Sequence, residues 1–333
     1  MTIKEIAALA GVSPAAVSLV INHKPGVSDS KRQEILDLLE SCHYSPARRP
    51  RQNTFQNFLF LKYIRNGFLV EENTGFIAAI MDSIEMECRK QGYALRIVVS
   101  SGNLEETISD IDFSSVSGIF VLGTELDPDS YSVLKRIPIP YIVIDNDMPH
   151  FSCNTITMNN SEMVYEAVKH LASLGFPDIG YFRSNMSIQN FEERATAFYQ
   201  TVKEFHLTCE KEQEFLLEPT MLGAYASLKQ YLLQGLSLPR CCFADNDTIA
   251  IGAMKALQEF GYRIPDDICV IGFDDIHFAA VNSPSLSTMS VPKKRIGFLA
   301  VKMLINSIEN GECNNSKIQV GGEIVIRRST LLE

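Results

Sequence analysis

The sequence predicts an α/β protein with a small helical N-terminal domain and a larger core of two doubly wound parallel sheets. Three observations predict this fold. In about the first fifty residues, apolar residues recur at helical spacing between tight-turn signals. From Phe58 onward, short apolar runs alternate with amphipathic helical stretches, which is the pattern of βαβ units. The chain has 333 residues and contains more such units than one ordinary sheet holds, so we expect two sheets.

The N-terminal part is expected to form three short helices around one small core. Thr2 begins the first helix in a capping box with the glutamate three residues later. Gly11 supplies a tight turn, Ser13 caps the second helix, and Ser28 caps the third. Three helices with such a turn between the first two form the helix-turn-helix arrangement, whose second helix enters the major groove of DNA.

The distribution of charge also points to DNA. Residues 1–52 contain seven lysines and arginines against five acidic residues, whereas the whole chain has a net charge of −10. An acidic protein with a basic end should contact phosphates with that end. The densest basic cluster is Arg48, Arg49 and Arg51. We expect these arginines to neutralise phosphates or enter the minor groove, and the alternative is a solvated linker.

The N-terminal motif resembles the DNA-binding headpiece of the lactose-repressor (LacI/GalR) family of bacterial transcription regulators. The resemblance rests on residues 3–13, on the pairs at 17–18 and 21–22, and on Tyr44-Ser45-Pro46. A three-helix domain without a DNA role is the alternative. The resemblance implies a helix-turn-helix headpiece over residues 1–46, followed by a hinge over residues 47–56.

The resemblance also implies which residues contact DNA. We expect these contacts at Thr2, Ser13, Pro14, Ala15, Ser18, Leu19, Asn22, Ser28, Tyr44, Arg48, Arg49 and Arg51. Pro14, Ala15 and Leu19 stand where the family usually has base-reading polar groups, so at most they contact a thymine methyl. Asn53 stands where the family has a leucine that wedges into the minor groove. We therefore expect DNA binding without the wedge, and a degenerate regulator with weak DNA binding is the alternative.

The core is expected to alternate strands and helices along the chain. We predict strands at 58–61, 95–99, 119–122, 141–144, 179–182, 241–244 and 269–273, and helices at 76–92, 161–174, 192–205 and 250–260. The family resemblance continues here, for example at 245–247, 264–268 and 272–275. It implies a periplasmic-binding-protein-like core for effector binding and dimerisation. The implied divisions are a core over 57–333, an N-lobe of about 57–156 plus 286–318, and a C-lobe of about 157–285 plus 319–333.

A ligand site is expected between the lobes. Ligands of open α/β sheets bind beyond the carboxyl ends of the strands, and Asp145, Asn246 and Asp274 each follow a predicted strand. A guanidinium, a carboxamide and carboxylates suit a polyhydroxylated or carboxylated small molecule. The alternatives are helix caps for the strand-end residues and a core role for the phenylalanines. Matches to the family's effector positions, with their neighbours, give the expected site as Phe76, Asp145, Arg194, Asn246, Phe273 and Asp274.

Other function classes lack their motifs. The chain has no GxGxxG, no phosphate-binding GxxxxGK loop, no HExxH and no GxSxG, so we expect no enzyme, although a doubly wound enzyme is the alternative from another class. The eight cysteines form no CxxC pair and no zinc-ligand spacing, so we expect no metal and no cofactor. Without a signal peptide or a membrane span, a reduced cytoplasmic protein is expected.

The expected partners follow from these observations. The C-terminal run has no leucine heptads for a helical bundle, so we expect a homodimer, and its two headpieces would read a pseudo-palindromic double-stranded DNA operator. Together with these observations, the family resemblance implies a transcriptional repressor of a carbohydrate-utilisation operon. A sugar or sugar derivative bound between the lobes would control it.

Overall fold

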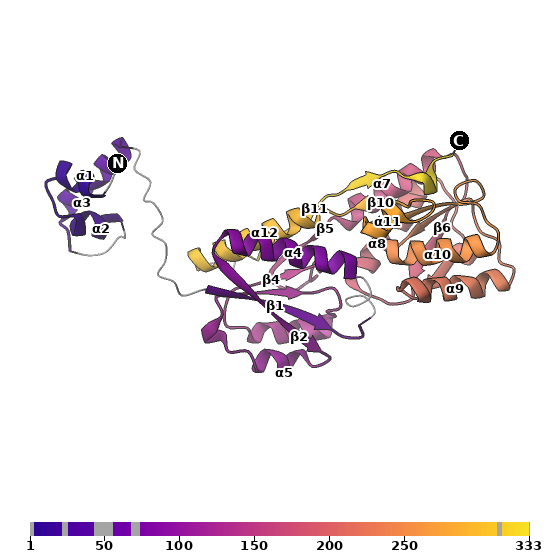
Figure 1. Cartoon of the computed structure of the whole chain (residues 1–333), viewed down its shortest axis with the longest axis horizontal. Helices are drawn as coiled ribbons and strands as arrows, with labels where there is room; N and C mark the ends of the chain where they lie inside the picture. Colours follow the sequence, from indigo (N-terminus) through magenta and orange to yellow (C-terminus); the bar gives the residue numbers. More distant parts are fainter. Residues whose placement is uncertain (1–2, 22–25, 43–55, 68–73, 312–314, 333) are drawn as a thin grey trace. The chain divides into compact units, whose positions relative to one another are not determined.

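The computed structural model describes residues 3–21, 26–42, 56–67, 74–311 and 315–332. The chain divides into two compact units, Met1–Thr54 and Phe55–Glu333, and each is described by itself (Figure 1). Most of the expected hinge, residues 47–55, lies outside the described residues.

The N-terminal unit contains the three predicted helices. They are α1 (Ile3–Leu9), α2 (Pro14–Ile21) and α3 (Asp29–Ser41). Gly11 has a φ of +63° in the turn between the first two helices, a conformation that glycine adopts without strain. The backbone N–H of Ala16 donates to Ser13 Oγ at 3.2 Å, so Ser13 caps α2 as predicted. Fully buried side chains from all three helices form its core, among them Ile6, Val17 and Ile35.

The first lobe of the core is built on a six-stranded sheet with the order β11-β5-β4-β3-β1-β2. Its strands are β1 (Gln56–Ile64), β2 (Tyr93–Ser101), β3 (Gly118–Leu122), β4 (Tyr141–Ile144), β5 (Asn154–Met158) and β11 (Lys317–Val320), all parallel. Its helices are α4 (Thr74–Lys90), α5 (Leu104–Ser109), α6 (Pro128–Tyr131) and α12 (Lys293–Asn310).

Alternate residues of the central strands face opposite sides of this sheet. Phe58 and Phe60 of β1 pack in the cluster that includes α4 and α12, whereas Leu59 and Leu61 pack in the cluster that includes α5. Both faces are therefore covered by apolar side chains. This explains why the strand is apolar at nearly every central position, as in parallel sheets buried on both sides.

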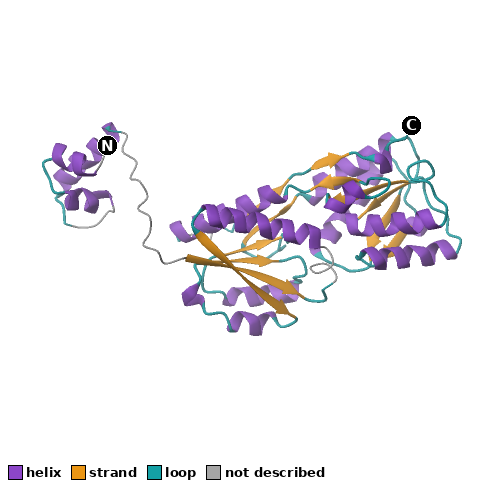
Figure 2. Ribbon diagram, in the orientation of Figure 1, coloured by secondary structure: helices purple, strands orange, loops and turns teal. Residues whose placement is uncertain are grey.

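The second lobe is built on another six-stranded sheet, with the order β12-β10-β9-β8-β6-β7. Figure 2 draws the strands of the chain in orange and its helices in purple. Its strands are β6 (Gly180–Ser184), β7 (Glu214–Leu217), β8 (Cys241–Ala244), β9 (Cys269–Asp274), β10 (Ser287–Ser290) and β12 (Glu323–Val325), and only β10 with β12 pair antiparallel among these described strands. Its helices are α7 (Asn160–Ser173), α8 (Gln189–Glu204), α9 (Met221–Leu233), α10 (Asp247–Glu259) and α11 (His277–Val281). Short 3₁₀ helices lie at Phe113–Ser115, Ser132–Arg136, Lys211–Gln213 and Arg328–Thr330.

The chain passes between the two sheets after β5, after β10 and after β11. We expected the later segment of the first lobe to begin at residue 286. However, β10 pairs with β9 in the second sheet, so that segment begins after Ser290. Likewise, β5 and β11 continue in the first sheet to Met158 and Val320, two residues past the expected boundaries. The fold class itself, a helix-turn-helix headpiece with a core of two doubly wound sheets, is confirmed.

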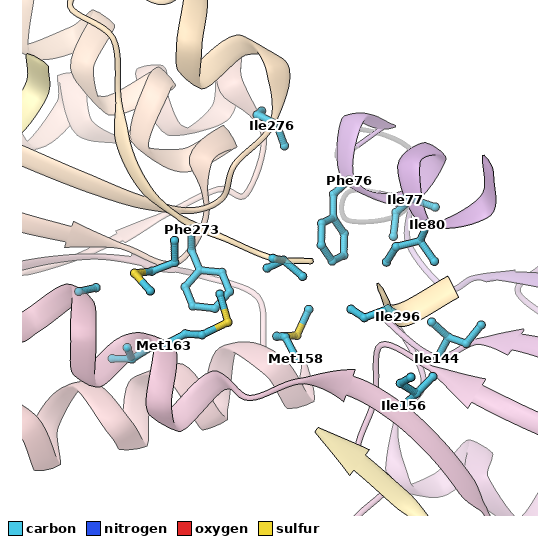
Figure 3. Packing of buried hydrophobic residues seen from close by; sticks show 14 of the residues in the cluster. Phe76, Ile77, Ile80, Ile144, Ile156, Met158, Met163, Phe273, Ile276 and Ile296 are labelled. Carbon is cyan, nitrogen blue, oxygen red and sulfur yellow. The ribbon is translucent and has the colours of Figure 1, made fainter. Parts of the chain in front are cut away.

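The largest apolar cluster includes residues of both lobes. Phe76 on α4 and Phe273 on β9 belong to it. In Figure 3, Met158 lies between the side chains near Phe273 and those near Phe76. Burial of apolar surface is the main favourable term in folding, so this cluster stabilises the junction between the lobes. None of the described helices is long and apolar enough to cross a membrane.

Candidate ligand site and DNA-binding helix

A small cavity lies between the two lobes, and we call it the inner cavity. It is lined by Phe76, Thr124 and Asp145 of the first lobe and by Ile188, Asn190, Phe191, Arg194 and Asp274 of the second. Its volume is about 20 Å³, which holds about one water molecule. A larger ligand therefore requires the lining side chains or the two lobes to move apart.

Strand ends place the acidic groups of this cavity. Asp145 directly follows β4, and Asp274 is the last residue of β9. Carboxyl ends of parallel strands meet at one edge of a sheet, where ligands of this fold class bind. Both residues have positive φ angles, 66° for Asp145 and 112° for Asp274. Such backbone conformations are unfavourable for residues with side chains and cluster at ligand sites.

The side chain of Arg194, on α8, is buried and held from several directions. Its Nε donates to Asn160 Oδ1 at 2.9 Å, and its Nη1 donates to the carbonyl oxygen of Asp245 at 2.5 Å. Its Nη2 lies 3.7 Å from Asp274 Oδ1. The guanidinium carbon lies 3.7 Å from the centroid of the Phe273 ring, in a cation–π arrangement. These contacts fix the orientation of the guanidinium at the wall of the inner cavity.

Asp145 connects the two lobes. Thr124 Oγ1 donates to its Oδ2 at 2.5 Å, and Asn190 Nδ2 donates to its Oδ1 at 2.9 Å and to its carbonyl oxygen at 3.0 Å. Thr124 belongs to the first lobe and Asn190 to the second. Burial raises the pKa of the Asp145 carboxyl to about 7, although hydrogen bonds and Arg194 act in the opposite direction. This carboxyl group therefore takes up a proton close to neutral pH.

The two polar residues that directly follow β8, Asp245 and Asn246, hold the local structure together. Asp245 accepts hydrogen bonds from the Ser184 N–H at 2.7 Å and from the Tyr181 hydroxyl, and burial raises its pKa to about 6. Asn246 is the N-cap of α10, because its Oδ1 accepts from the Ile249 N–H at 2.8 Å. We expected Asn246 at the ligand site, but it is not among the residues that line the inner cavity. Its observed contacts are those of a helix cap, which was the alternative.

The structure brings together most of the expected site residues. The inner cavity is lined by four of them, namely Phe76, Asp145, Arg194 and Asp274. Phe273 packs against the guanidinium of Arg194 but does not line the cavity. The sequence analysis missed Thr124, Ile188, Asn190 and Phe191. A signal was available for two of them. Asn190 and Phe191 precede Arg194 by four and three positions, which places them on the same face of a helix.

No candidate metal site accompanies this cavity. Within the described ranges, no group of three or more histidine, cysteine, aspartate and glutamate side chains is arranged to hold a metal ion. The seven cysteines that the structure describes are free thiols.

The helix α2, which we expect to bind DNA, exposes mainly apolar groups. Pro14 and Ala15 are exposed, and Ser18 and Leu19 are partly exposed, while Val17 points into the headpiece core. Ser13 and Ser28 are also exposed. Several expected DNA contacts lie outside the described residues, namely Thr2, Asn22, Tyr44, Arg48, Arg49 and Arg51, as do Pro50 and Asn53 of the expected hinge.

A helix-turn-helix headpiece joined to a two-lobed core with a buried polar cavity defines a class of ligand-controlled DNA-binding regulators. The family of bacterial regulatory proteins, lacI family, matches residues 2–47, and a periplasmic binding protein-like domain matches residues 168–330. The chain belongs to the lacI family of DNA-binding transcriptional repressors.

Relatives support this assignment over the whole chain. A HTH-type transcriptional repressor PurR of Mannheimia succiniciproducens is 30% identical over 338 residues, which cover 98% of each chain. The repressor of the same name from Vibrio vulnificus is 31% identical over 336 residues, covering 98% of this chain and 97% of the relative. These relatives are repressors and not enzymes, as we expected of this chain.

Two solved structures share the fold. A lac repressor dimer bound to operator and the anti-inducer ONPF has a TM-score of 0.73 and 21% identity, covering 100% of this chain and 99% of that one. A complex of the transcriptional regulator CelR with cellobiose has a TM-score of 0.73 and 20% identity, covering 99% of each chain. At these identities the likeness supports the fold alone.

Proposed function

We propose that this repressor controls a carbohydrate-utilisation operon, and that a sugar or sugar derivative binds in the inner cavity and changes its affinity for operator DNA. One observation carries the proposal. The fixed guanidinium of Arg194 and the carboxylates of Asp145 and Asp274 line one buried cavity that both lobes form. Such donors and acceptors suit the hydroxyl groups of a sugar, while Phe76 and Phe191 supply apolar surface for its ring.

The contacts of Asp145 suggest how a ligand would act on the core. Asn190 of the second lobe donates to Asp145 of the first, and both side chains line the inner cavity. A ligand that hydrogen-bonds to either group changes the energy of the contact between the lobes. A coupling of about 1–3 kcal/mol would change operator affinity by about 5- to 150-fold.

On the DNA side, α2 is proposed as the recognition helix. Ser13 and Ser18 would contact phosphates, and the apolar side chains Pro14, Ala15 and Leu19 would contact thymine methyl groups. The remaining proposed contacts are Thr2, Asn22, Ser28, Tyr44, Arg48, Arg49 and Arg51. The exposed apolar side chains of α2 also favour a second candidate, a regulator that keeps its ligand site but binds DNA weakly.

A homodimer is proposed as the DNA-binding species. Apolar side chains are exposed on both lobes, with Ile97 and Val99 on β2 and Phe278 and Val281 on α11. A second copy of the chain would cover such surfaces, and a structure of the same fold is titled a dimer bound to operator. Sedimentation should give a dimer at micromolar concentration, and Phe278→Asp should weaken it. A stable monomer would overturn this part of the proposal.

The proposal is tested with DNA from upstream of the gene and of its neighbours. Electrophoretic mobility shift would measure operator affinity with and without mono- and disaccharides, which a thermal-shift assay would screen first. We expect Arg194→Ala and Asp274→Ala to lose the ligand response and to retain basal DNA binding. Arg263→Ala, an exposed arginine paired with Asp267, is the control. A normal ligand response in both cavity variants would show that the inner cavity is not the effector site.

A further inference from the structure

A second cavity adjoins the inner cavity, and we call it the outer chamber. It is lined by Arg65 and Asn66 after β1, by Asp127 after β3, and by Gln189 and Glu192 at the start of α8, among others. Its volume is about 310 Å³, within the range of small-molecule sites, whereas that of the inner cavity is about 20 Å³. Both cavities share Ile188 in their walls, so they are direct neighbours.

Helix α8 presents one face to each of these two cavities. Asn190 and Arg194, four positions apart, line the inner cavity, while Gln189 and Glu192, three positions apart, line the outer chamber. Residues three or four apart share a helix face, so this division follows from the helical period. A ligand bound at Arg194 therefore lies beside a second set of polar groups on the same helix.

The charged groups of the outer chamber are mostly acidic. Arg65 Nη1 lies 2.5 Å from Asp127 Oδ2, and Arg183 Nη2 lies 3.1 Å from Glu192 Oε2. The buried carboxylate of Glu125 accepts hydrogen bonds from the backbone N–H groups of Arg65 at 2.6 Å and Asn66 at 2.9 Å, so it holds the backbone of these two residues in place. One arginine against three carboxylates in the wall disfavours a phosphate or a carboxylate in this chamber.

The neutral polar groups of the chamber suit hydroxyl groups. The carboxamides of Asn66 and Gln189 can both donate and accept hydrogen bonds, as a sugar hydroxyl does. Asp127 and Glu192 accept hydrogen bonds, and the guanidinium of Arg65 donates them. The lining thus matches an uncharged ring that carries several hydroxyl groups.

We propose that the outer chamber is a second subsite, and that the effector is a neutral molecule with two polar rings, such as a disaccharide or a glycoside. One ring would bind at Arg194 in a widened inner cavity, and the other would occupy the outer chamber past Ile188. This inference rests on the proposed function of the inner cavity. It extends that proposal by specifying the size and the charge of the ligand.

Titration calorimetry on the full chain tests ligand size and charge. The probes are cellobiose, maltose, lactose and sucrose, their component monosaccharides, glucose 6-phosphate, and purine bases. We expect at least one disaccharide to bind about tenfold or more tightly than its components, and glucose 6-phosphate to bind no more tightly than glucose. Equal affinity for a monosaccharide, tighter binding of the phosphate or of a purine base, or no saccharide binding at millimolar concentration would overturn the inference.

Two variants locate the second ring. Arg65→Gln and Glu192→Gln should each lower the affinity for the preferred disaccharide by about tenfold and leave that for its monosaccharides unchanged. Arg136→Gln is the matched control, because Arg136 is 57% exposed and its Nη1 lies 2.6 Å from Glu105, while Arg65 is 54% exposed with its ion pair at 2.5 Å.

The outcomes separate the two proposals. If Asp274→Ala abolishes saccharide binding and the outer-chamber variants leave it unchanged, the second subsite is wrong and the proposed function stands. If Asp274→Ala also leaves binding unchanged, the inner cavity is wrong as well.

Discussion

The proposed DNA-binding helix α2 and the cavity-lining helix α8 use their side chains in opposite ways. On α2, Pro14 and Ala15 are exposed and Leu19 is partly exposed, and none of them can hydrogen-bond to a base through its side chain. On α8, Asn190 and Arg194 are buried and bound to several partners. Under the proposed function, this difference predicts that operator affinity depends on phosphate contacts and apolar fit, whereas ligand response depends on a buried polar network. The two properties should therefore respond to different variants and different solution conditions.

The largest expected effect concerns the arginines that follow the headpiece. Arg48→Ala with Arg51→Ala should weaken binding to operator and to unrelated DNA alike, by about 100-fold at moderate salt, because two charge-assisted phosphate contacts are lost. The slope of log K against log salt should fall by about one per contact. Filter binding at several salt concentrations measures both, with Arg89→Ala as an exposed control on α4. An unchanged slope would show that these arginines do not touch the backbone.

An intermediate effect concerns the pH dependence of core stability. Because burial raises the pKa of Asp145 to about 7 in the folded chain, its ionisation destabilises the fold. The free energy of unfolding from this group is highest below about pH 4 and falls as the pH rises through 7. Asp145→Asn should remove about 1–3 kcal/mol of that dependence. Asp245, whose pKa is raised to about 6, and Asp247, whose pKa burial also raises, should retain part of it.

Urea unfolding at pH 5 and at pH 8 measures this difference. Asp129→Asn, at an exposed position on α6, serves as the control. The same pH dependence in Asp145→Asn and in the unaltered chain would exclude Asp145 as its source.

The smallest expected effect concerns thymine. If Pro14, Ala15 and Leu19 contact methyl groups, uracil in place of thymine in one half-site should weaken binding by about threefold to fourfold per contacted base, the value of one buried methyl group. Substitution outside the half-sites is the control. Unchanged affinity at every thymine would mean that α2 reads the operator by other means.

The sequence predicted the elements whose signals are local. Helical spacing gave the three headpiece helices, and apolar runs gave the central strands of both sheets, since these strands are buried on both faces. The sheet to which β10 belongs was not predictable, because strand pairing depends on contacts distant in sequence. Asp145, Arg194 and Asp274 were predicted together from strand ends and family matches, and they line one cavity.

The remaining errors at the site have a physical cause. A strand-end Asn before a helix can cap that helix or face a ligand, and the local pattern is the same for both roles, as Asn246 illustrates. Helical spacing could have placed Asn190 beside Arg194, but its hydrogen bond to Asp145 of the other lobe, 45 positions away, was not predictable from the sequence.

Effector affinity measured on the free protein and on its operator complex tests the central claim most directly. Two sites that are coupled change each other's affinity by the same factor. We predict that operator DNA changes the affinity for the saccharide by about 5- to 150-fold, and that the saccharide changes operator affinity by that same factor. Asp274→Ala should abolish both changes. Equal effector affinity with and without operator would contradict the account, because a ligand in the inner cavity would then not control DNA binding.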